Sequence, residues 1–198
     1  MTLRELGEEQ LLAQIAVSGS LSRQVVGGVR DDCAVLKTAA KGKGWLLLKT
    51  DAVVEGIHFS VSAPAAAVGW KAMMRPLSDI AAMAGQPLFA MITLALPGET
   101  EVSWVKALYQ GLRRAAARFE VEIVGGETTA TTGSKVIAVT LSGRVDAGRC
   151  VFRSAGKVND VLFVTGRLGG SIAGRHLKFT PRLDEARWLA SHFAVHAM

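Results

Sequence analysis

Apolar runs that alternate with helix-length segments constrain the fold of this chain more than any other feature. Three runs have strand character, at residues 44–54, 88–96 and 135–145. Between them lie residues 65–84 and 102–119, whose apolar side chains recur with helical spacing. Strands that alternate with helices of crossover length predict an α/β (α+β) fold, in which the helices cover a mixed sheet.

Shorter patterns predict further elements. Residues 4–17 have the spacing of an amphipathic helix, and residues 33–36 that of a short strand. A strand at 121–124 runs into Gly125 and Gly126, a pair that most often marks a turn. Pro76 interrupts the 65–84 pattern, which leaves open two helices with Pro76 in the first turn of the second.

A change in composition near residues 148–157 predicts a domain boundary. A polar turn at 156–160 is followed by an apolar run at 161–165, which we expect to be a strand, and then by a helical stretch after the glycines of 166–170. We therefore divide the chain into an N-terminal domain, 1–150, and the start of a second α/β domain, 151–198. The second part is close to the length of about 40 residues below which domains seldom fold unaided, so we expect it to be incomplete.

The charge balance raises the question of a nucleic-acid partner. The net charge is +6, with 49% apolar and 20% charged residues. The cations are scattered or lie on a helix, as at residues 112–118. No aromatic residues interleave with them, and Tyr109 is the only tyrosine. A basic surface also attracts small phosphorylated anions. We therefore expect such anions, and no nucleic acid, as partners.

The sequence also indicates a compartment. The N-terminal segment is acidic and amphipathic, unlike a signal peptide, and no apolar run approaches the length of a membrane span. Cys33 and Cys150 lie far apart without a metal-ligand pattern. We expect a cytoplasmic protein that does not cross a membrane.

Four acidic residues near the ends of the expected strands and loops carry most of the chemical information: Asp31, Asp51, Asp79 and Glu127. Magnesium ions in proteins bridge a few carboxylates to substrate phosphates, and glycines after a strand let backbone N–H groups approach a phosphate. Each feature alone has a simpler reading, because an aspartate also caps a turn or a helix. Their occurrence together predicts magnesium–nucleotide chemistry.

His58 follows Asp51 by seven residues. Successive strand residues face opposite sides, so the two side chains would not share a face if the strand continued straight. Gly56 permits a bend that redirects the histidine. A lone histidine is more often a satisfied core or surface residue, so its role depends on the surrounding motifs.

Five segments, in this order, identify a resemblance: GVRDDCAVL, LKTDAVVEGIHF, PLSDIAAMAGQP, IVGGETT and RSAGKVNDVLFVTGRLGGSIAG. They resemble the thiamine-monophosphate kinases of the aminoimidazole ribonucleotide synthetase superfamily, from about Glu5 to Met198. The resemblance implies an N-terminal α/β domain whose sheet pairs with that of a second subunit, and a larger C-terminal α/β domain. It also implies transfer of the γ-phosphoryl group of ATP to thiamine monophosphate, with Mg²⁺ as cofactor.

The resemblance also implies roles for single residues. His58 matches a position that contacts thiamine monophosphate. No catalytic residue is implied beyond those that position metal and substrates. The implied metal ligands are Asp31, Thr50, Asp51, Asp79 and Glu127, and the implied nucleotide contacts are Gly126, Glu127 and Arg153.

The chain departs from the family pattern at several positions. Lys49 stands where a serine commonly helps to bind metal, so only its backbone carbonyl would be available. Glu127 replaces a usual aspartate, which shifts the carboxylate but keeps its charge. Arg30 and Asn159 replace glycines, and Pro76 replaces an asparagine. These departures bear on the number and geometry of the metal ions.

The family continues into a motif of the type DxSDG, and this chain stops before it. We therefore expect an N-terminal fragment without appreciable kinase activity by itself. Two alternatives stay open. The chain is another ATP-using synthetase of the superfamily, for purine or selenophosphate chemistry, or it is a non-catalytic dimerisation module. The selenophosphate enzymes carry a reactive cysteine in an N-terminal glycine-rich loop, and this chain has no cysteine there. The purine enzymes carry a DGVGTK-like segment where this chain has TDAVVEGIHF.

Overall fold

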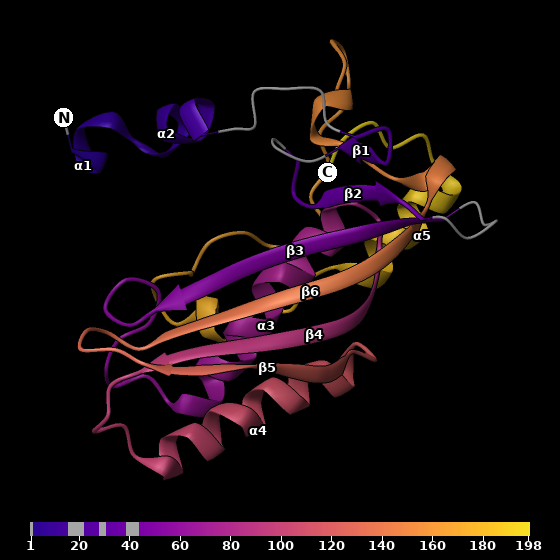
Figure 1. The fold of residues 1–198 in the computed structure, drawn as a ribbon. Helices are drawn as coiled ribbons and strands as arrows, with labels where there is room; N and C mark the ends of the chain where they lie inside the picture. Colours follow the sequence, from indigo (N-terminus) through magenta and orange to yellow (C-terminus); the bar gives the residue numbers. More distant parts are fainter. Residues whose placement is uncertain (1, 16–21, 28–30, 39–43) are drawn as a thin grey trace.

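The structure, a computed structural model, describes residues 2–15, 22–27, 31–38 and 44–198. These residues form a six-stranded mixed sheet in the order β1-β2-β3-β6-β4-β5 (Figure 1). β4 and β5 are parallel, and all other neighbours are antiparallel. The strands are β1 (Val25–Gly27), β2 (Ala34–Lys37), β3 (Gly44–Val54), β4 (Gln86–Leu96), β5 (Glu122–Ala130) and β6 (Val136–Asp146). The predicted mixed α/β fold is confirmed, although no sequence pattern predicted the three-residue β1.

Two long helices connect the parallel strands and cover one face of the sheet. α3 (Ala65–Ala82) links β3 to β4, and α4 (Val102–Arg118) links β4 to β5. They pack closely, because a Cβ atom on Gly111 would lie 1.9 Å from the carbonyl oxygen of Ala66. The equivalent distance from Gly69 to the carbonyl oxygen of Leu108 would be 2.1 Å. Glycine at both positions lets the two helix backbones touch.

The possibility of two helices around Pro76 is wrong. α3 runs without a break from Ala65 to Ala82 and contains Pro76 in its interior. Proline removes one backbone hydrogen bond from a helix, but Met73, Met74 and Leu77 beside it are fully buried. Burial of this apolar face against the sheet stabilises the helix through the proline.

The expected turn at Gly125 and Gly126 is also wrong, because both residues lie inside β5. The register of β5 against β4 shifts next to Gly125, as a bulge would produce. A Cβ atom on Gly126 would lie 1.8 Å from the carbonyl oxygen of Ile92 in β4. The glycine therefore permits close strand pairing, and Glu127 follows on the same strand.

At the N-terminus, the helix expected at 4–17 is divided into α1 (Leu3–Leu6) and α2 (Glu8–Ile15). Gly7 separates them with a φ of 78°, a left-handed conformation that glycine adopts readily. Residues 16 and 17 lie outside the described residues. Neither helix buries a residue, and both lie apart from the sheet (Figure 1).

The prediction of a strand at 161–165 is wrong. These residues have no regular structure, and the side chains of Leu162 and Phe163 are 96% and 86% exposed. A strand needs a neighbour for its backbone hydrogen bonds, and no strand of the described residues pairs with this run. The helical stretch expected after 166–170 contains turns and a short 3₁₀-helix, η3 (Arg175–Leu177), in place of an α-helix.

A C-terminal helix packs on the N-terminal part of the protein. α5 (Leu183–His192) buries Leu183 and Ala186 in the same core as α3. The indole Nε1 of Trp70 on α3 donates a hydrogen bond of 2.9 Å to the carbonyl oxygen of Phe179. The residues just before and within α5 thus cover part of α3. In the part of the chain that is described, no helix is long and apolar enough to span a membrane.

The two faces of the sheet differ. The face toward the helices is apolar and buried, with Leu47, Ile92, Val139 and Leu141 at most 1% exposed. On the opposite face, the strand registers place Leu48, Ser142 and Phe89 in one row across β3, β6 and β4. Leu48 and Phe89 in this row are 37% and 46% exposed. The long strands therefore present an open face that carries exposed apolar side chains.

Candidate functional site

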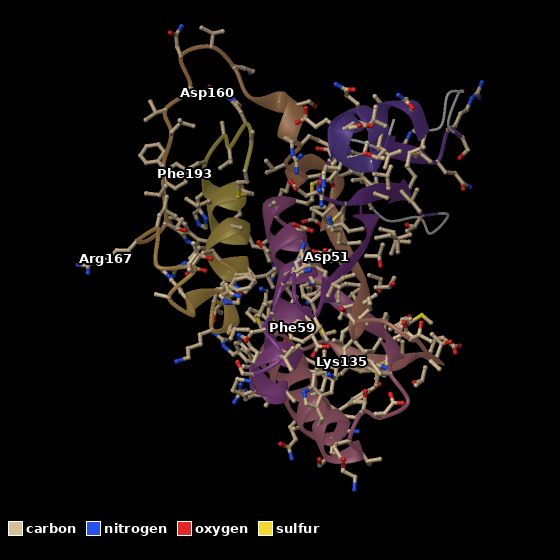
Figure 2. All side chains as sticks on the ribbon, turned by 90° about the vertical axis from the view of Figure 1, so that its left-hand side faces the viewer. Asp51, Phe59, Lys135, Asp160, Arg167 and Phe193 are labelled. Atoms are coloured by element: carbon tan, nitrogen blue, oxygen red, sulfur yellow. The ribbon has the colours of Figure 1, made fainter. Side chains whose placement is uncertain are left out.

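Four charged side chains meet between β3 and α3. Lys49 and Asp51 alternate with the buried Leu47 on β3, so both face the helix. The Lys49 Nζ lies 2.7 Å from the Asp79 Oδ2 of α3. Arg75, one turn earlier on α3, contacts both carboxylate oxygens of Asp51. The distances are 3.0 Å from Nη2 to Oδ1 and 3.1 Å from Nε to Oδ2. Figure 2 shows Asp51 in this region of the protein.

Burial and neighbouring charge act together on Asp79. Burial raises the pKa of Asp79, and the charges of Asp51 and Asp32 raise it further, against the opposing effect of Lys49. Burial would lower the pKa of Lys49, but the hydrogen bond to Asp79 and the charges of Asp79 and Asp51 outweigh it, so this pKa lies above its ordinary value. Asp79 therefore depends on the Lys49 ammonium for the stability of its charged form.

A second group of charges lies at the start of β2. The Asp31 Oδ1 accepts a hydrogen bond of 2.8 Å from the backbone N–H of Arg153. The Arg153 guanidinium forms an ion pair with Asp32. Residues more than 120 positions apart thus lie together, and Asp32 is close enough to raise the pKa of Asp79. The structure brings Asp31, Asp51, Asp79 and Arg153 to one region at the β2–β3 side of the sheet.

His58 lies in a turn after β3, where Gly56 has a φ of 81°. The predicted bend is therefore confirmed. The His58 Nδ1 accepts a hydrogen bond of 3.1 Å from the backbone N–H of Val54. Burial, with help from the charges of Arg75 and Lys71, lowers the pKa of His58. The imidazole thus favours its neutral form.

Lys71 joins His58 to the C-terminal segment. Its side chain is 8% exposed, and its ammonium donates to the carbonyl oxygen of His58 and lies 2.7 Å from the Nδ1 of His176. Burial and the nearby charge of Arg75 lower the pKa of Lys71. This buried cation is within hydrogen-bond distance of two histidine residues from different parts of the chain.

Other predicted site residues lie elsewhere. Thr50 points to the open face of the sheet, where its Oγ1 accepts a hydrogen bond of 3.2 Å from Thr140. Gly126 and Glu127 lie on β5, which two strands separate from β3. At about 4.8 Å per strand this is roughly 14 Å. The structure therefore does not bring Thr50, Gly126 or Glu127 to the Asp51–Asp79 region.

Sequence reasoning did not select three of the residues that define this region: Asp32, Lys71 and Arg75. Arg75 carried a usable signal, because it precedes Asp79 by four residues and thus shares its helix face. Asp32 had one too, since it sits beside Asp31 in the same loop. Lys71 had none beyond being a lysine in an otherwise apolar stretch.

No group of three or more His, Cys, Asp or Glu side chains suited to hold a metal ion occurs among the described residues. A cavity of about 710 Å³ lies between α5 and the β3–β6 end of the sheet, lined in part by Arg144, Arg149 and Trp188. None of the predicted site residues lines it. Its polar groups lie at the end of the sheet away from Asp51 and Asp79. The candidate site therefore consists of the charged groups around Asp51 and Asp79.

Comparison with known proteins gives the family. Residues 30–145, more than half of the chain, match the model of the family described as AIR synthase related protein, N-terminal domain. The chain belongs to this family. The thiamine-monophosphate kinase of Bacillus subtilis (strain 168) is 39% identical over 85% of this chain and 52% of its own length. That of Aquifex aeolicus (strain VF5) is 40% identical over 97% of this chain and 66% of its own length.

A solved structure supports the same assignment. AaThiL complexed with AMPPCP and TMP superposes with a TM-score of 0.84 at 35% identity, over 96% of this chain and 64% of that one. The predicted resemblance to thiamine-monophosphate kinases is therefore confirmed. The chain spans between 50% and 66% of the length of the curated relatives that it matches.

Proposed function

We propose that this chain is part of a kinase that transfers the γ-phosphoryl group of ATP to thiamine monophosphate. The observation that carries the proposal is the similarity, over 96% of the chain, to a structure that contains AMPPCP and TMP. In the reaction the terminal P–O bond of ATP breaks, a phosphate oxygen of thiamine monophosphate forms the new bond, and ADP leaves. The product is thiamine diphosphate.

Phosphoryl transfer depends mainly on positioning and on neutralising charge. We propose that Arg153, oriented by Asp31 and Asp32, contacts the nucleotide phosphates. Gly126 and Glu127 lie on β5, apart from Arg153, and we propose that they form a second, more distant part of the nucleotide site. We propose that His58, whose imidazole favours its neutral form and lies in the turn after β3, contacts thiamine monophosphate. The Lys71 ammonium, which donates to the carbonyl oxygen of His58, suits an anionic substrate.

The oxygen side chains of Asp51 and Asp79 suit the chemistry of Mg²⁺, but both are already bound to cationic side chains. The residues present therefore do not fit a resident ion at these two carboxylates. We propose that Mg²⁺ enters with ATP as the Mg–ATP complex. The chain would then bind Mg²⁺ weakly alone and more tightly with nucleotide.

Assembly, domain division and location complete the proposal. We propose a homodimer through the open sheet face, and a division into residues 1–150 and 151–198. The two cysteines, Cys33 and Cys150, are free thiols, as is usual for proteins of a reducing compartment. We therefore propose a cytoplasmic location.

Isothermal titration of the chain with AMPPCP and Mg²⁺, and separately with thiamine monophosphate, tests the proposed function. We expect the parent to bind both ligands. Arg153→Gln should weaken AMPPCP binding by about tenfold or more, since hydrogen bonds to charged groups contribute roughly 1.5–3 kcal/mol. Arg149→Gln removes the same charge from an exposed neighbouring position and should leave binding unchanged.

A folded chain that binds neither ligand would contradict the kinase proposal and favour a non-catalytic dimerisation module. Binding of nucleotide with no binding of thiamine monophosphate would instead favour another synthetase of the superfamily. Equal affinities of the Arg153→Gln variant and the parent for AMPPCP would show that Arg153 is not a nucleotide contact.

A further inference from the structure

The four charged side chains between β3 and α3 form two ion pairs, each between a strand residue and a helix residue. β3 contributes a cation at Lys49 and an anion at Asp51, two residues apart on one face. α3 contributes a cation at Arg75 and an anion at Asp79, four residues apart on one helix face. Each cation contacts the anion of the opposite element. The group has no net charge, because its two positive and two negative charges cancel.

The pairs are formed by specific geometry. Arg75 contacts both oxygens of Asp51, and its Nη1 also donates a hydrogen bond of 3.0 Å to the carbonyl oxygen of Ala52. Two-point contacts of this kind are among the strongest between charged side chains. The side chains of Asp51 and Asp79 are only 19% and 23% exposed. A metal ion at either carboxylate would therefore have to displace a cation that is already in place.

The carboxylates need these cations. Asp79 is close to two other carboxylates, Asp51 and Asp32, and burial adds to the cost of its charge. Charged groups away from water are stable when they are paired or bound to a metal. In this chain the pairing comes from the side chains of Lys49 and Arg75.

We propose that Lys49 and Arg75 are built-in counter-cations that take the place of divalent metal ions at Asp79 and Asp51. The two carboxylates are then neutralised at all times, whether or not Mg²⁺ or nucleotide is present. A variant that lacks one of these cations should require a metal ion in its place. The inference does not rest on the proposed kinase activity, because it concerns Mg²⁺ binding in the absence of nucleotide.

The decisive experiment compares Lys49→Ser with Lys37→Ser. Both substitutions replace a strand lysine and lower the net charge of the chain by one, but Lys37 is exposed and its side chain has no contact with a carboxylate in the described part of the chain. Isothermal titration with MgCl₂, without nucleotide, measures the affinity of each variant and of the parent. An opposite charge within about 4–6 Å shifts a carboxylate by roughly 1–3 pKa units. We therefore expect Lys49→Ser to bind Mg²⁺ at least about tenfold more tightly than the parent.

Thermal unfolding provides a second readout. Lys49→Ser should unfold at a lower temperature than the parent in a chelator, and Mg²⁺ should restore much of the loss. The parent and Lys37→Ser should show little response to Mg²⁺. Lys49→Arg keeps a cation beside Asp79 and should behave like the parent in both measurements.

Arg75→Gln provides an independent test at Asp51, and it applies even if Lys49→Ser does not fold. It should also bind Mg²⁺ at least about tenfold more tightly than the parent. The proposal is overturned if Lys49→Ser and Arg75→Gln bind Mg²⁺ no better than the parent. It is equally overturned if the parent already binds Mg²⁺ tightly without nucleotide, or if Lys37→Ser gains affinity to the same extent as Lys49→Ser.

Discussion

Single residues decide which charges meet in this protein. Lys49 and Asp51 face α3 because each is separated by one residue from its neighbour on that face of β3, whereas Thr50 between them points to the open face. A change of one position along the strand would reverse this assignment. The contrast between Asp51 and Thr50 shows that two adjacent residues of one motif lie on opposite sides of the sheet.

His58 is the residue whose protonation we expect to respond to its surroundings. Burial and the cations Arg75 and Lys71 lower its pKa below the ordinary value of 6.5. The unfolded chain therefore binds more protons between the folded pKa and 6.5, and this histidine makes stability fall as the pH is lowered through that window. Titration of the His58 Cε1 proton by NMR, assigned with His58→Gln, should give a pKa below 6.5.

Lys71→Met removes one of the cations that lower this pKa, so the pKa of His58 should rise in that variant. Lys106→Met is the control, because Lys106 is exposed on α4, outside the His58 environment. A value of 6.5 or higher for the parent would contradict the expected environment of His58. An unchanged value in Lys71→Met would contradict the effect of the lysine.

At the scale of elements, contact between α3 and α4 depends on glycine. Gly69 and Gly111 each allow the backbone of the other helix to approach, and the Ala66 and Leu108 carbonyls occupy the space that a Cβ atom would need. These two helices cover the apolar face of the sheet. Their separation therefore affects the whole core.

Gly111→Ala should destabilise the protein although alanine favours helices more than glycine does. The new methyl group would overlap a carbonyl oxygen, and overpacking of this kind typically costs about 1–3 kcal/mol. This corresponds to a loss of roughly 2–12 °C in melting temperature for a chain of this size. Gly98→Ala is the matched control, because no atom lies within 4 Å of its added Cβ and its φ is not left-handed. A Gly111→Ala variant as stable as the Gly98→Ala variant would show that the helices can move apart at no cost.

Among the residues that the structure describes, no layer of helices covers the second face of the sheet (Figure 1). Leu48 and Phe89 are joined there by Met91 and Val124, which are 51% and 57% exposed. An exposed apolar patch on one side of a sheet is typical of an interaction surface. A two-fold dimer places the same patch of each subunit against the other, which agrees with the homodimer that we propose.

Light scattering tests this assembly. The parent should have the mass of a dimer at micromolar concentration, and Met91→Glu should shift it toward the monomer because it places two like charges at the centre of the interface. Leu12→Glu alters a side chain of similar exposure on α2 and should leave the dimer intact. A monomeric parent with an intact fold, or equal masses for the two variants, would refute the sheet interface.

The sequence by itself determined the three long strands β3, β4 and β6 and the helices α3 and α4, because hydrophobic periodicity follows directly from which faces are buried. It also determined the family, through motifs that matched in order, and the bend at Gly56, because glycine alone adopts that conformation at low cost. The local sequence pattern did not predict the structure where pairing with another strand decides it. Residues 161–165 have the composition of a strand and form none, since pairing requires a second strand. Gly125 and Gly126 have the composition of a turn and lie in β5, because β4 pairs with them through its backbone.

Only the tertiary structure decided which carboxylates are paired with cationic side chains. Asp51 and Asp79 look like free metal ligands in the sequence, and Lys49 looks like a substitution of one ligand. The packing of α3 on β3 brings Lys49 to Asp79 and Arg75 to Asp51. Charges act through space over a few ångströms, so residues 24 and 30 positions apart in the chain neutralise each other once the helix and the strand are in contact.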